Sequence, residues 1–191
     1  MVSVTAILLA AGSSRRMGSE NKLLLPLGGK PMVVRVAEAL ERSCADELVV
    51  VLGHDAERVR EVLRGYRFRF AYNPGHLEGM TSSIQAGIRA ASEGSSGWLI
   101  CLGDMPWLEA ADYDRMLEAV SGRKEILVPV CEGRRGNPVF FSQHFREALL
   151  AHSEPEGCRG IVRSHAACVR EVVFEHKRIF RDVDVPEDLG F

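Results

Sequence analysis

Two basic side chains follow a run of small residues near the start of the chain, and together they could bind phosphate. Ala10, Ala11 and Gly12 come directly after an apolar run, and small residues let backbone N–H groups approach a ligand closely. Arg16 and Lys22 then add positive charge within a short reach, which complements a polyphosphate. The segment therefore predicts a site for the phosphates of a nucleotide.

The glycine spacing in this loop excludes the two common phosphate-binding motifs. A P-loop requires a glycine, four residues and then Gly-Lys-Ser/Thr, which the loop does not contain. The dinucleotide-binding fingerprint requires three glycines in the spacing G-x-G-x-x-G, and Gly12 and Gly18 do not match it. A nucleotide site in this loop must follow a different pattern.

A polyphosphate site of this kind also needs a divalent cation, and one carboxylate stands where it could hold one. Mg²⁺ is usually bound by one or two carboxylates, with water and phosphate oxygens completing its coordination. Asp104 ends the apolar run 97–103, so a buried strand would carry it to the ligand edge of a sheet, although it could instead cap the following helix. A second carboxylate must come from elsewhere, and the residues alone leave Asp182 and Asp184 as alternatives.

Apolar runs alternate with amphipathic segments along the chain, which predicts an α/β fold. Strands are expected at residues 2–9, 47–53, 67–72, 97–103, 126–130, 139–141 and 169–174. Helices are expected at residues 31–40, 55–63, 79–91, 110–120, 144–151 and 159–164, with Asp55 capping the second. This alternation favours a Rossmann-like, open and mainly parallel sheet with helices on both faces and ligands at the carboxyl ends of its strands.

The composition fits a single domain over residues 1–191 and excludes several classes of protein. The net charge of -2 gives no basic field for nucleic acid. The five cysteines are widely spaced with no C-x-x-C pair, which favours reduced thiols in a cytoplasmic protein over a zinc site or a disulfide framework. The first apolar run is too short to span a membrane and has no basic leader, so no membrane association is expected.

A longer string around the first loop resembles the signature of the MobA-like nucleotidyltransferases, LAAG-x-S-x-R-M-G followed by a short spacer and a lysine. The matching residues are Leu9, Ala10, Ala11, Gly12, Ser14, Arg16, Met17, Gly18 and Lys22. The string GDMP at 103–106 resembles the metal motif of that family. The string DVDVPEDL at 182–189 resembles its D-x-D-T-P-E-D-L element, with Val185 where threonine is usual.

The resemblance extends from residue 6 to residue 189 and implies a fold of the nucleotide-diphospho-sugar transferase type. It implies Mg²⁺ as the cofactor, with Asp104 and Asp184 as its ligands, and Arg16, Lys22 and Asp104 as catalytic residues. An acceptor phosphate would attack the α-phosphorus of a nucleoside triphosphate and pyrophosphate would leave. Such a transfer depends on positioning and charge stabilisation rather than on a nucleophilic side chain.

The same resemblance indicates where the nucleotide would bind. The string LAAG is typical of the cytidylyl-transferring branch of the family, whereas guanylyl-transferring relatives usually have LAGG, so CTP is the expected donor. Ser82 and Ser83, at the start of the third helix, are expected to contact base and ribose, although helix capping explains them equally well. The residues assigned to the nucleotide are Leu9, Ala10, Ala11, Gly12, Ser14, Arg16, Lys22, Asn73, Gly79, Ser82 and Ser83.

The acceptor expected from that branch is molybdopterin or its molybdenum form, and a client molybdoenzyme would receive the product. Arg135, Asn137 and Arg159 are the residues assigned to the acceptor. The family often has G-D-x-G in this region, where the present chain has Cys158 in place of the aspartate. The alternatives are GTP as the donor, a sugar or polyol phosphate as the acceptor, and a binding protein that carries nucleotide or cofactor without turnover.

Overall fold

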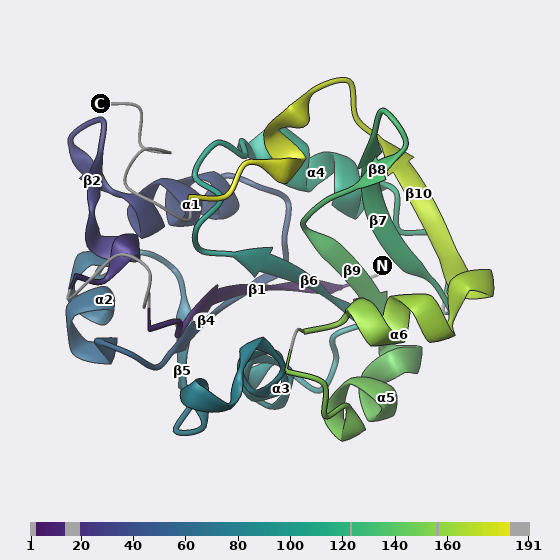
Figure 1. The fold of residues 1–191 in the computed structure, drawn as a ribbon, viewed down its shortest axis with the longest axis horizontal. Helices are drawn as coiled ribbons and strands as arrows, with labels where there is room; N and C mark the ends of the chain where they lie inside the picture. Colours follow the sequence, from purple (N-terminus) through teal and green to yellow (C-terminus); the bar gives the residue numbers. More distant parts are fainter. Residues whose placement is uncertain (1–2, 14–19, 123, 156, 184–191) are drawn as a thin grey trace.

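An eight-stranded mixed sheet runs through the centre of the molecule (Figure 1). The computed structural model describes residues 3–13, 20–122, 124–155 and 157–183. The strands lie in the order β10-β7-β9-β6-β1-β4-β5, and β8 pairs with β7. Their bounds are β1 Val4–Ala10, β4 Glu47–Leu52, β5 Arg69–Tyr72, β6 Gly97–Leu102, β7 Ile126–Cys131, β8 Arg134–Arg135, β9 Val139–Ser142 and β10 Val169–Val173. A separate two-stranded ribbon consists of β2 (Pro26–Leu27) and β3 (Lys30–Pro31).

The strands that come first in the chain form the parallel half of the large sheet. β1 pairs in parallel with β4 on one side and with β6 on the other, and β4 pairs in parallel with β5. Leu9 lies opposite both Val51 and Leu102, so the carboxyl ends of three strands reach the same edge. β1 is buried along nearly its whole length, as its unbroken apolar sequence predicts.

β9 enters the sheet in the opposite direction, between β6 and β7. It pairs antiparallel with both of them, whereas β10 runs parallel to β7. The open, mainly parallel but mixed sheet predicted from the sequence is therefore confirmed. The placement of β9 between two strands that precede it in the chain is a finding of the structure.

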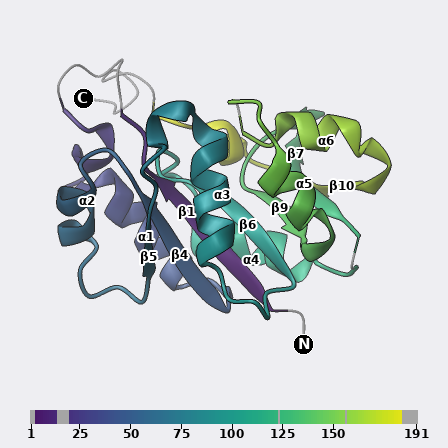
Figure 2. The same cartoon turned by 90° about the horizontal axis from the view of Figure 1, so that it is seen from below.

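Helices cover both faces of the sheet, as Figures 1 and 2 show. α1 (Met32–Glu41) and α4 (Ala110–Glu118) cover one face, and α2 (Ala56–Val62) contributes side chains to the same apolar core. α3 (Met80–Ala90), α5 (Arg146–Ala151) and α6 (Arg159–Ser164) pack on the other face around a second core. The two-sided arrangement explains why the central strands are apolar on both faces.

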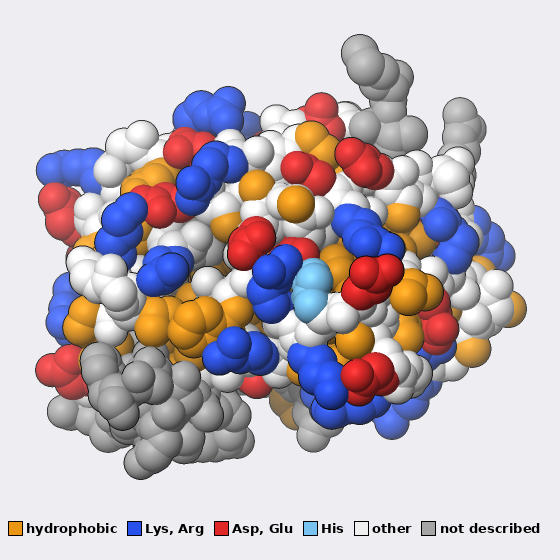
Figure 3. All heavy atoms as spheres, turned by 90° about the horizontal axis from the view of Figure 1, so that it is seen from above, with side chains coloured by type: hydrophobic (Ala, Val, Ile, Leu, Met, Phe, Trp, Pro, Cys, Tyr) orange, Lys and Arg blue, Asp and Glu red, His pale blue; other side chains and the backbone are white. Residues whose placement is uncertain are grey.

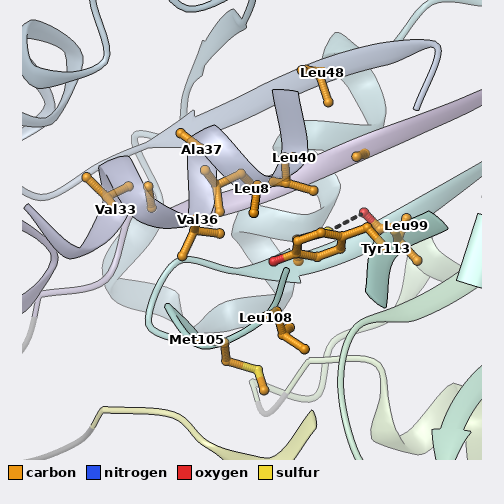
Figure 4. Close-up of a cluster of buried hydrophobic side chains, with 14 of the residues drawn as sticks. Leu8, Val33, Val36, Ala37, Leu40, Leu48, Leu99, Met105, Leu108 and Tyr113 are labelled. Carbon is orange, nitrogen blue, oxygen red and sulfur yellow. Dashed lines mark hydrogen bonds between the residues drawn. The ribbon is translucent and has the colours of Figure 1, made fainter. Parts of the chain in front are cut away.

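The apolar stripe of α1 lies at the centre of the larger core (Figure 4). The sequence predicts this stripe from its helical spacing, and the structure buries all of it: Val33, Val36, Ala37 and Leu40. The stripe belongs to the same core as Leu8 of β1, Leu99 of β6 and Tyr113 of α4, all of which are fully buried. This packing fixes the strands whose ends carry the site described below.

On the opposite face, α3 lies close against β1 and β4, and a glycine permits this approach. A Cβ atom added at Gly87 would lie 2.4 Å from Cγ2 of Ile7 and 3.1 Å from Cγ2 of Val51. Contacts under about 3 Å require one partner to move, so α3 could not keep this position with a larger residue there. The close packing sets the position of the first turn of α3, which lies at the ligand edge.

The structure corrects the predicted cap of α2. Asp55 precedes the helix, as expected, but its side chain makes no capping hydrogen bond. Its backbone has a left-handed conformation, with φ 52°, whereas a capping aspartate has an extended one that directs its carboxylate toward the first N–H groups. The Asp55 carboxylate lies instead 3.4 Å from Nη1 of Arg58.

The described basic side chains do not gather into a single field on the face shown in Figure 3. They are interspersed with acidic and apolar side chains over that face, in keeping with the net charge of -2. None of the helices in the described part of the chain has the length and apolar character needed to cross a membrane. All five cysteines are free thiols.

Candidate active site

The ends of β1 and β6 lie against each other at the carboxyl edge of the sheet, and Gly103 makes this contact. The Gly103 N–H donates to the carbonyl oxygen of Leu9 at 3.1 Å. A Cβ atom at Gly103 would lie 2.8 Å from that same oxygen. The absence of a side chain therefore allows the chain after β6 to turn close to β1, and it brings Asp104 beside the loop that contains Ala11 and Gly12.

Lys22 reaches the same place from a short 3₁₀ helix, Lys22–Leu24. Asn21 caps this helix, because its side-chain Oδ1 accepts a hydrogen bond from the N–H of Leu23 at 3.1 Å. Leu23 is buried and anchors the turn in the core. The Lys22 ammonium nitrogen then lies 2.7 Å from Oδ2 of Asp104 and 2.8 Å from the carbonyl oxygen of Val183.

The Asp104 carboxylate has one oxygen bound by Lys22 and one oxygen that suits a cation. The side chains of Lys22 and Asp104 are only 15% and 22% exposed, so the charged pair is shielded from bulk water. Oδ1 of Asp104 is buried and has no hydrogen-bond partner among the described residues. A buried anionic oxygen without a donor is costly, and a divalent cation would satisfy it.

A cleft of about 370 Å³ opens next to this pair. It is lined by Leu9, Ala11, Gly12, Ser13, Lys22, Leu23, His76, Leu77, Gly79, Met80, Ser83, Leu102, Gly103 and Asp104. We call it the donor cleft. Seven residues that the sequence assigns to nucleotide, catalysis or metal are thus brought together: Leu9, Ala11, Gly12, Lys22, Gly79, Ser83 and Asp104. Ser14, Arg16 and Asp184 lie outside the described residues, and among the described ones no three His, Cys, Asp or Glu side chains form a metal-binding group.

Three of the residues assigned to the nucleotide do not line the donor cleft. Ala10 is fully buried and belongs to the core beneath β1. Asn73 is nearly buried, and its Nδ2 donates to the hydroxyl oxygens of Ser82 and Ser83 at 2.9 and 3.0 Å. The Ser82 hydroxyl also lies 2.8 Å from the carbonyl oxygen of Gly75, so Asn73 and Ser82 hold the turn before α3 together.

The turn before α3 places other side chains in the donor cleft, and the sequence analysis did not single them out. Leu77 is 65% exposed and Met80 is 42% exposed, which is unusual for large apolar residues at a cleft. His76 lines the same wall, and its Nδ1 lies 3.2 Å from the carbonyl oxygen of Asn73. A histidine three residues before the predicted helix start was the available signal for a polar group at this position.

A second cavity of about 360 Å³ contains all three residues assigned to the acceptor. Arg135, Asn137 and Arg159 line it together with a largely apolar wall, which consists of Met80, Ile84, Ile100, Leu102, Val128, Val139, Phe141, Cys158 and Val162. Gly136 and Arg163 complete the lining. We call it the acceptor cavity. Its floor is formed by β6, β7 and β9, so the antiparallel strand creates the surface on which an acceptor would lie.

The arginines of the acceptor cavity differ in their partners. Nε and Nη2 of Arg135 both donate to Oε1 of Glu171, at 3.1 and 3.0 Å, and Nη2 of Arg163 lies 3.7 Å from Oε2 of Glu154. The Arg159 side chain is exposed and forms no ion pair or hydrogen bond with a described residue. Burial raises the pKa of Cys158 to about 12, so the thiol at the position of the usual aspartate is neutral and unreactive.

The donor cleft and the acceptor cavity adjoin each other. Met80 and Leu102 line both, one from the start of α3 and the other from the end of β6. Hydrogen bonds fix this boundary, because the Met80 N–H donates to the carbonyl oxygen of Pro155 at 3.0 Å and the Gly157 N–H donates to Oγ1 of Thr81 at 3.1 Å. Two ligands bound in these spaces would meet beside Met80.

Sequence comparison places this geometry in a known family. Residues 6–169 match the MobA-like NTP transferase domain, and the chain belongs to this family. The resemblance deduced from the loop after β1 is therefore confirmed.

Three curated relatives differ in how much of their own length the chain matches. The bifunctional protein GlmU of Symbiobacterium thermophilum is 36% identical over 121 residues, and the match spans only 25% of the length of that protein. The nicotine blue oxidoreductase of Paenarthrobacter nicotinovorans is 30% identical over 97% of this chain and 94% of its own length. A probable molybdenum cofactor guanylyltransferase of Methanosarcina acetivorans is 28% identical over 95% of this chain and 82% of its own.

Solved structures confirm the predicted fold of the nucleotide-diphospho-sugar transferase type. Rv0371c of Mycobacterium tuberculosis H37Rv superimposes with a TM-score of 0.86 at 25% identity, covering 98% of this chain and 96% of that one. A nucleotidyl transferase from Methanothermobacter superimposes with a TM-score of 0.83 at 24% identity, covering 97% and 94%. A further structure of Rv0371c, in complex with manganese, has a TM-score of 0.80 at 24% identity, covering 97% and 95%.

Proposed function

We propose that the protein transfers CMP from CTP to the phosphate of molybdopterin, or of its molybdenum form, with release of pyrophosphate. The observation that carries this proposal is the adjacency of the donor cleft and the acceptor cavity, with Met80 and Leu102 common to both. Transfer between two phosphates requires both reactants to be held in contact and in line. Family membership supports a nucleotidyl transfer at this boundary.

Lys22 and Asp104 are the described residues proposed to act on the triphosphate. Asp104, with Asp184, would hold Mg²⁺, which supplies positive charge to the reacting phosphates. The buried, unpartnered Oδ1 of Asp104 supports a cation at this position, and the manganese complex of Rv0371c is a precedent in a similar fold. Lys22, with Arg16, would stabilise the charge that develops on the phosphate oxygens, because an ammonium shielded from water acts strongly on a nearby anion.

CTP is proposed as the donor from the sequence of the first loop, Leu-Ala-Ala-Gly. In the donor cleft, His76 and Leu77 provide a polar and an apolar contact for a base. If Nδ1 of His76 carries the proton and donates to Asn73, Nε2 is an acceptor and would favour a base with an exocyclic amino group. Cytosine has such a group, as guanine does, and uracil does not.

A flat ring system that bears a phosphate fits the acceptor cavity. Its wall is mostly aliphatic and aromatic, which suits the faces of a planar ring, and the Asn137 amide offers a hydrogen-bond partner for polar atoms at the ring edge. Arg159 has no carboxylate partner among the described residues and could meet the phosphate, with Asn137 and Arg135 beside it. A pterin with a phosphate tail has these properties, and a client molybdoenzyme in the cytoplasm would receive the product.

The first experiment compares thermal unfolding in Mg²⁺ with each of CTP, GTP, ATP and UTP. A ligand at about one hundred times its Kd stabilises the folded state by roughly 2.7 kcal/mol, which raises the Tm of a chain of this size by about 5–10 °C. A shift with CTP, followed by pyrophosphate release when molybdopterin is added, is the expected result. If only GTP raises the Tm, GTP and not CTP is the donor.

Two other functions are separated by the same assay. The oxidoreductase relative, which matches nearly the whole chain, makes a bound redox substrate the competing function, and that function predicts turnover without pyrophosphate. A nucleotide carrier predicts a thermal shift without any turnover. Pyrophosphate release that disappears in Asp104→Ala would exclude both of these alternatives.

A further inference from the structure

A short segment near the end of the described chain runs from the acceptor cavity to the donor cleft. We call residues 179–183 the bridging segment. It begins in the second half of the 3₁₀ helix Lys177–Phe180 and crosses the carboxyl edge of the sheet, where its yellow ribbon passes above β6 in Figure 1. Its two ends, Ile179 and Val183, are both fully buried, although the residues between them are partly or fully exposed.

At its first end the bridging segment is fixed to the turn that lines the acceptor cavity. The Asn137 N–H donates to the carbonyl oxygen of Ile179 at 3.0 Å. Gly136 lies against the same carbonyl, because a Cβ atom added there would be 2.4 Å from the Ile179 oxygen. The contact therefore has no free space, and any displacement of the turn displaces the bridging segment.

At its other end the bridging segment holds the charged pair of the donor cleft. The Val183 N–H donates to the main-chain carbonyl oxygen of Asp104 at 2.9 Å. The Val183 carbonyl oxygen accepts from the Lys22 ammonium at 2.8 Å. Lys22 is thus directed by a side-chain oxygen of Asp104 and by a main-chain oxygen whose position depends on the bridging segment.

Between its ends the bridging segment is stiffened by short-range contacts. The Arg181 N–H donates to the carbonyl oxygen of Arg178 at 3.1 Å, and the Asp182 N–H donates to that of Phe180 at 3.2 Å. The Arg181 guanidinium lies 4.4 Å from the centre of the Trp107 ring, within the range of a cation–π contact. A stiff segment transmits a shift from one end to the other, whereas a flexible one would absorb it.

We propose that the bridging segment couples the acceptor cavity to Lys22, with Val183 as a positioning residue that orients the Lys22 ammonium through its carbonyl oxygen. The inference rests on the proposed function, because it assumes that Lys22 acts on the triphosphate. Beyond that function, the geometry of the acceptor turn at Gly136 and Asn137 sets the affinity for the donor nucleotide, although neither residue lines the donor cleft.

The test is Gly136→Ala, measured by the affinity for a nucleoside triphosphate in the absence of any acceptor. The probe is whichever of CTP, GTP, ATP and UTP, with Mg²⁺, the wild-type protein binds most tightly by calorimetry. Gly136 has no left-handed φ, so its alanine variant acts through the collision with Ile179. We expect the Kd to rise by roughly 2- to 30-fold, the range usual for coupling between sites.

Gly94→Ala is the matched control for the added methyl group. Gly94 also lacks a left-handed φ, and no heavy atom lies within 4 Å of the position its Cβ would take. Its Kd for the same nucleotide should equal that of the wild type. Arg181→Ala provides a second route, because Arg181 is exposed and its loss loosens the bridging segment from Trp107 without a collision. It should weaken nucleotide binding in the same direction, even if Gly136→Ala fails to fold.

A double-mutant cycle with Lys22→Ala separates positioning from a general structural effect. If the bridging segment acts through Lys22, Gly136→Ala or Arg181→Ala should change the Kd little further once Lys22 is absent. An equal loss of affinity in both backgrounds, or a wild-type Kd for the single variants, would overturn the inference. A Lys22→Ala protein with unchanged affinity and turnover would instead refute the role of Lys22 in the proposed function.

Discussion

Replacing Asp104 by asparagine should abolish the binding of metal and nucleotide while leaving the protein folded. The change keeps the size of the side chain and removes its charge. Lys22 Nζ lies 2.7 Å from Oδ2 of Asp104, and at an effective dielectric constant of about 20 their gross attraction is about 6 kcal/mol. Much of this is offset by the cost of taking both charges out of water, which the variant no longer incurs at Asp104.

The net loss of stability in Asp104→Asn should therefore be about 1–3 kcal/mol. Asparagine can still accept a hydrogen bond from Lys22, and the Val183 carbonyl keeps its own bond to the ammonium. For a chain of this size the loss corresponds to a fall in Tm of roughly 2–12 °C. Without the carboxylate, Mg²⁺ would lose one of its two proposed ligands, so the rise of about 5–10 °C expected for saturating nucleotide should disappear.

Thermal unfolding with and without nucleotide and Mg²⁺ measures both quantities in one series. Asp55→Asn is the matched control, because Asp55 also forms an ion pair but lies outside the donor cleft, and asparagine tolerates its left-handed backbone well. The control should keep the full rise in Tm. A full rise in Asp104→Asn would refute the assignment of Asp104 as a metal ligand, and an unfolded variant would show that its charge is structural.

Three further changes test the acceptor cavity, the pH dependence and the packing. Arg159→Ala should raise the KM for a phosphate-bearing acceptor by about tenfold or more with the Kd for the nucleotide unchanged, and an unchanged KM would remove Arg159 from the site. Burial opposes the ionisation of Glu47, but hydrogen bonds from Ser92 and Thr5 outweigh it and lower its pKa. Its contribution to stability is therefore fully present above the ordinary glutamate pKa of about 4.3 and is lost as the pH falls through the lower pKa of the folded state, so urea titrations should show the difference between wild type and Glu47→Gln narrowing below about pH 4; a difference that widens as the pH falls there would contradict this. Gly87→Ala, despite its better helix propensity, should lower stability by about 1–3 kcal/mol through the collision with Ile7, and a higher Tm would show that α3 can move.

Sequence reasoning predicts well which residues lie together in the donor cleft, because that grouping depends on strand ends. The apolar runs of β1 and β6 predict buried parallel strands whose carboxyl ends lie at one edge of the sheet, and the structure pairs these two strands side by side. Asp104 and Lys22 are found there together. The three residues that the resemblance assigns to the acceptor also lie in a single cavity.

The same reasoning fails where the direction of a side chain decides whether a residue lines the cleft. Ser82 and Ser83 are neighbours in the first turn of α3, yet only Ser83 lines the donor cleft, because successive helical residues point about 100° apart. A polar sequence does not reveal which of the two completes the preceding turn. The contact between Lys22 and the Val183 carbonyl has no signal in the sequence, since any residue offers a main-chain oxygen at that position.

The donor cleft and the acceptor cavity are built mainly from different parts of the chain, which affects how proteins of this family can diverge in sequence. The described residues that line the donor cleft all come from the first 104 positions, whereas residues between 128 and 163 supply ten of the fourteen that line the acceptor cavity. Substitutions in the later segment can therefore reshape what is accepted while the earlier strands keep their parallel pairing and their loop. Selection could exchange one acceptor for another without rebuilding the nucleotide half, provided that the turn at Gly136 and Asn137 keeps its contact with Ile179.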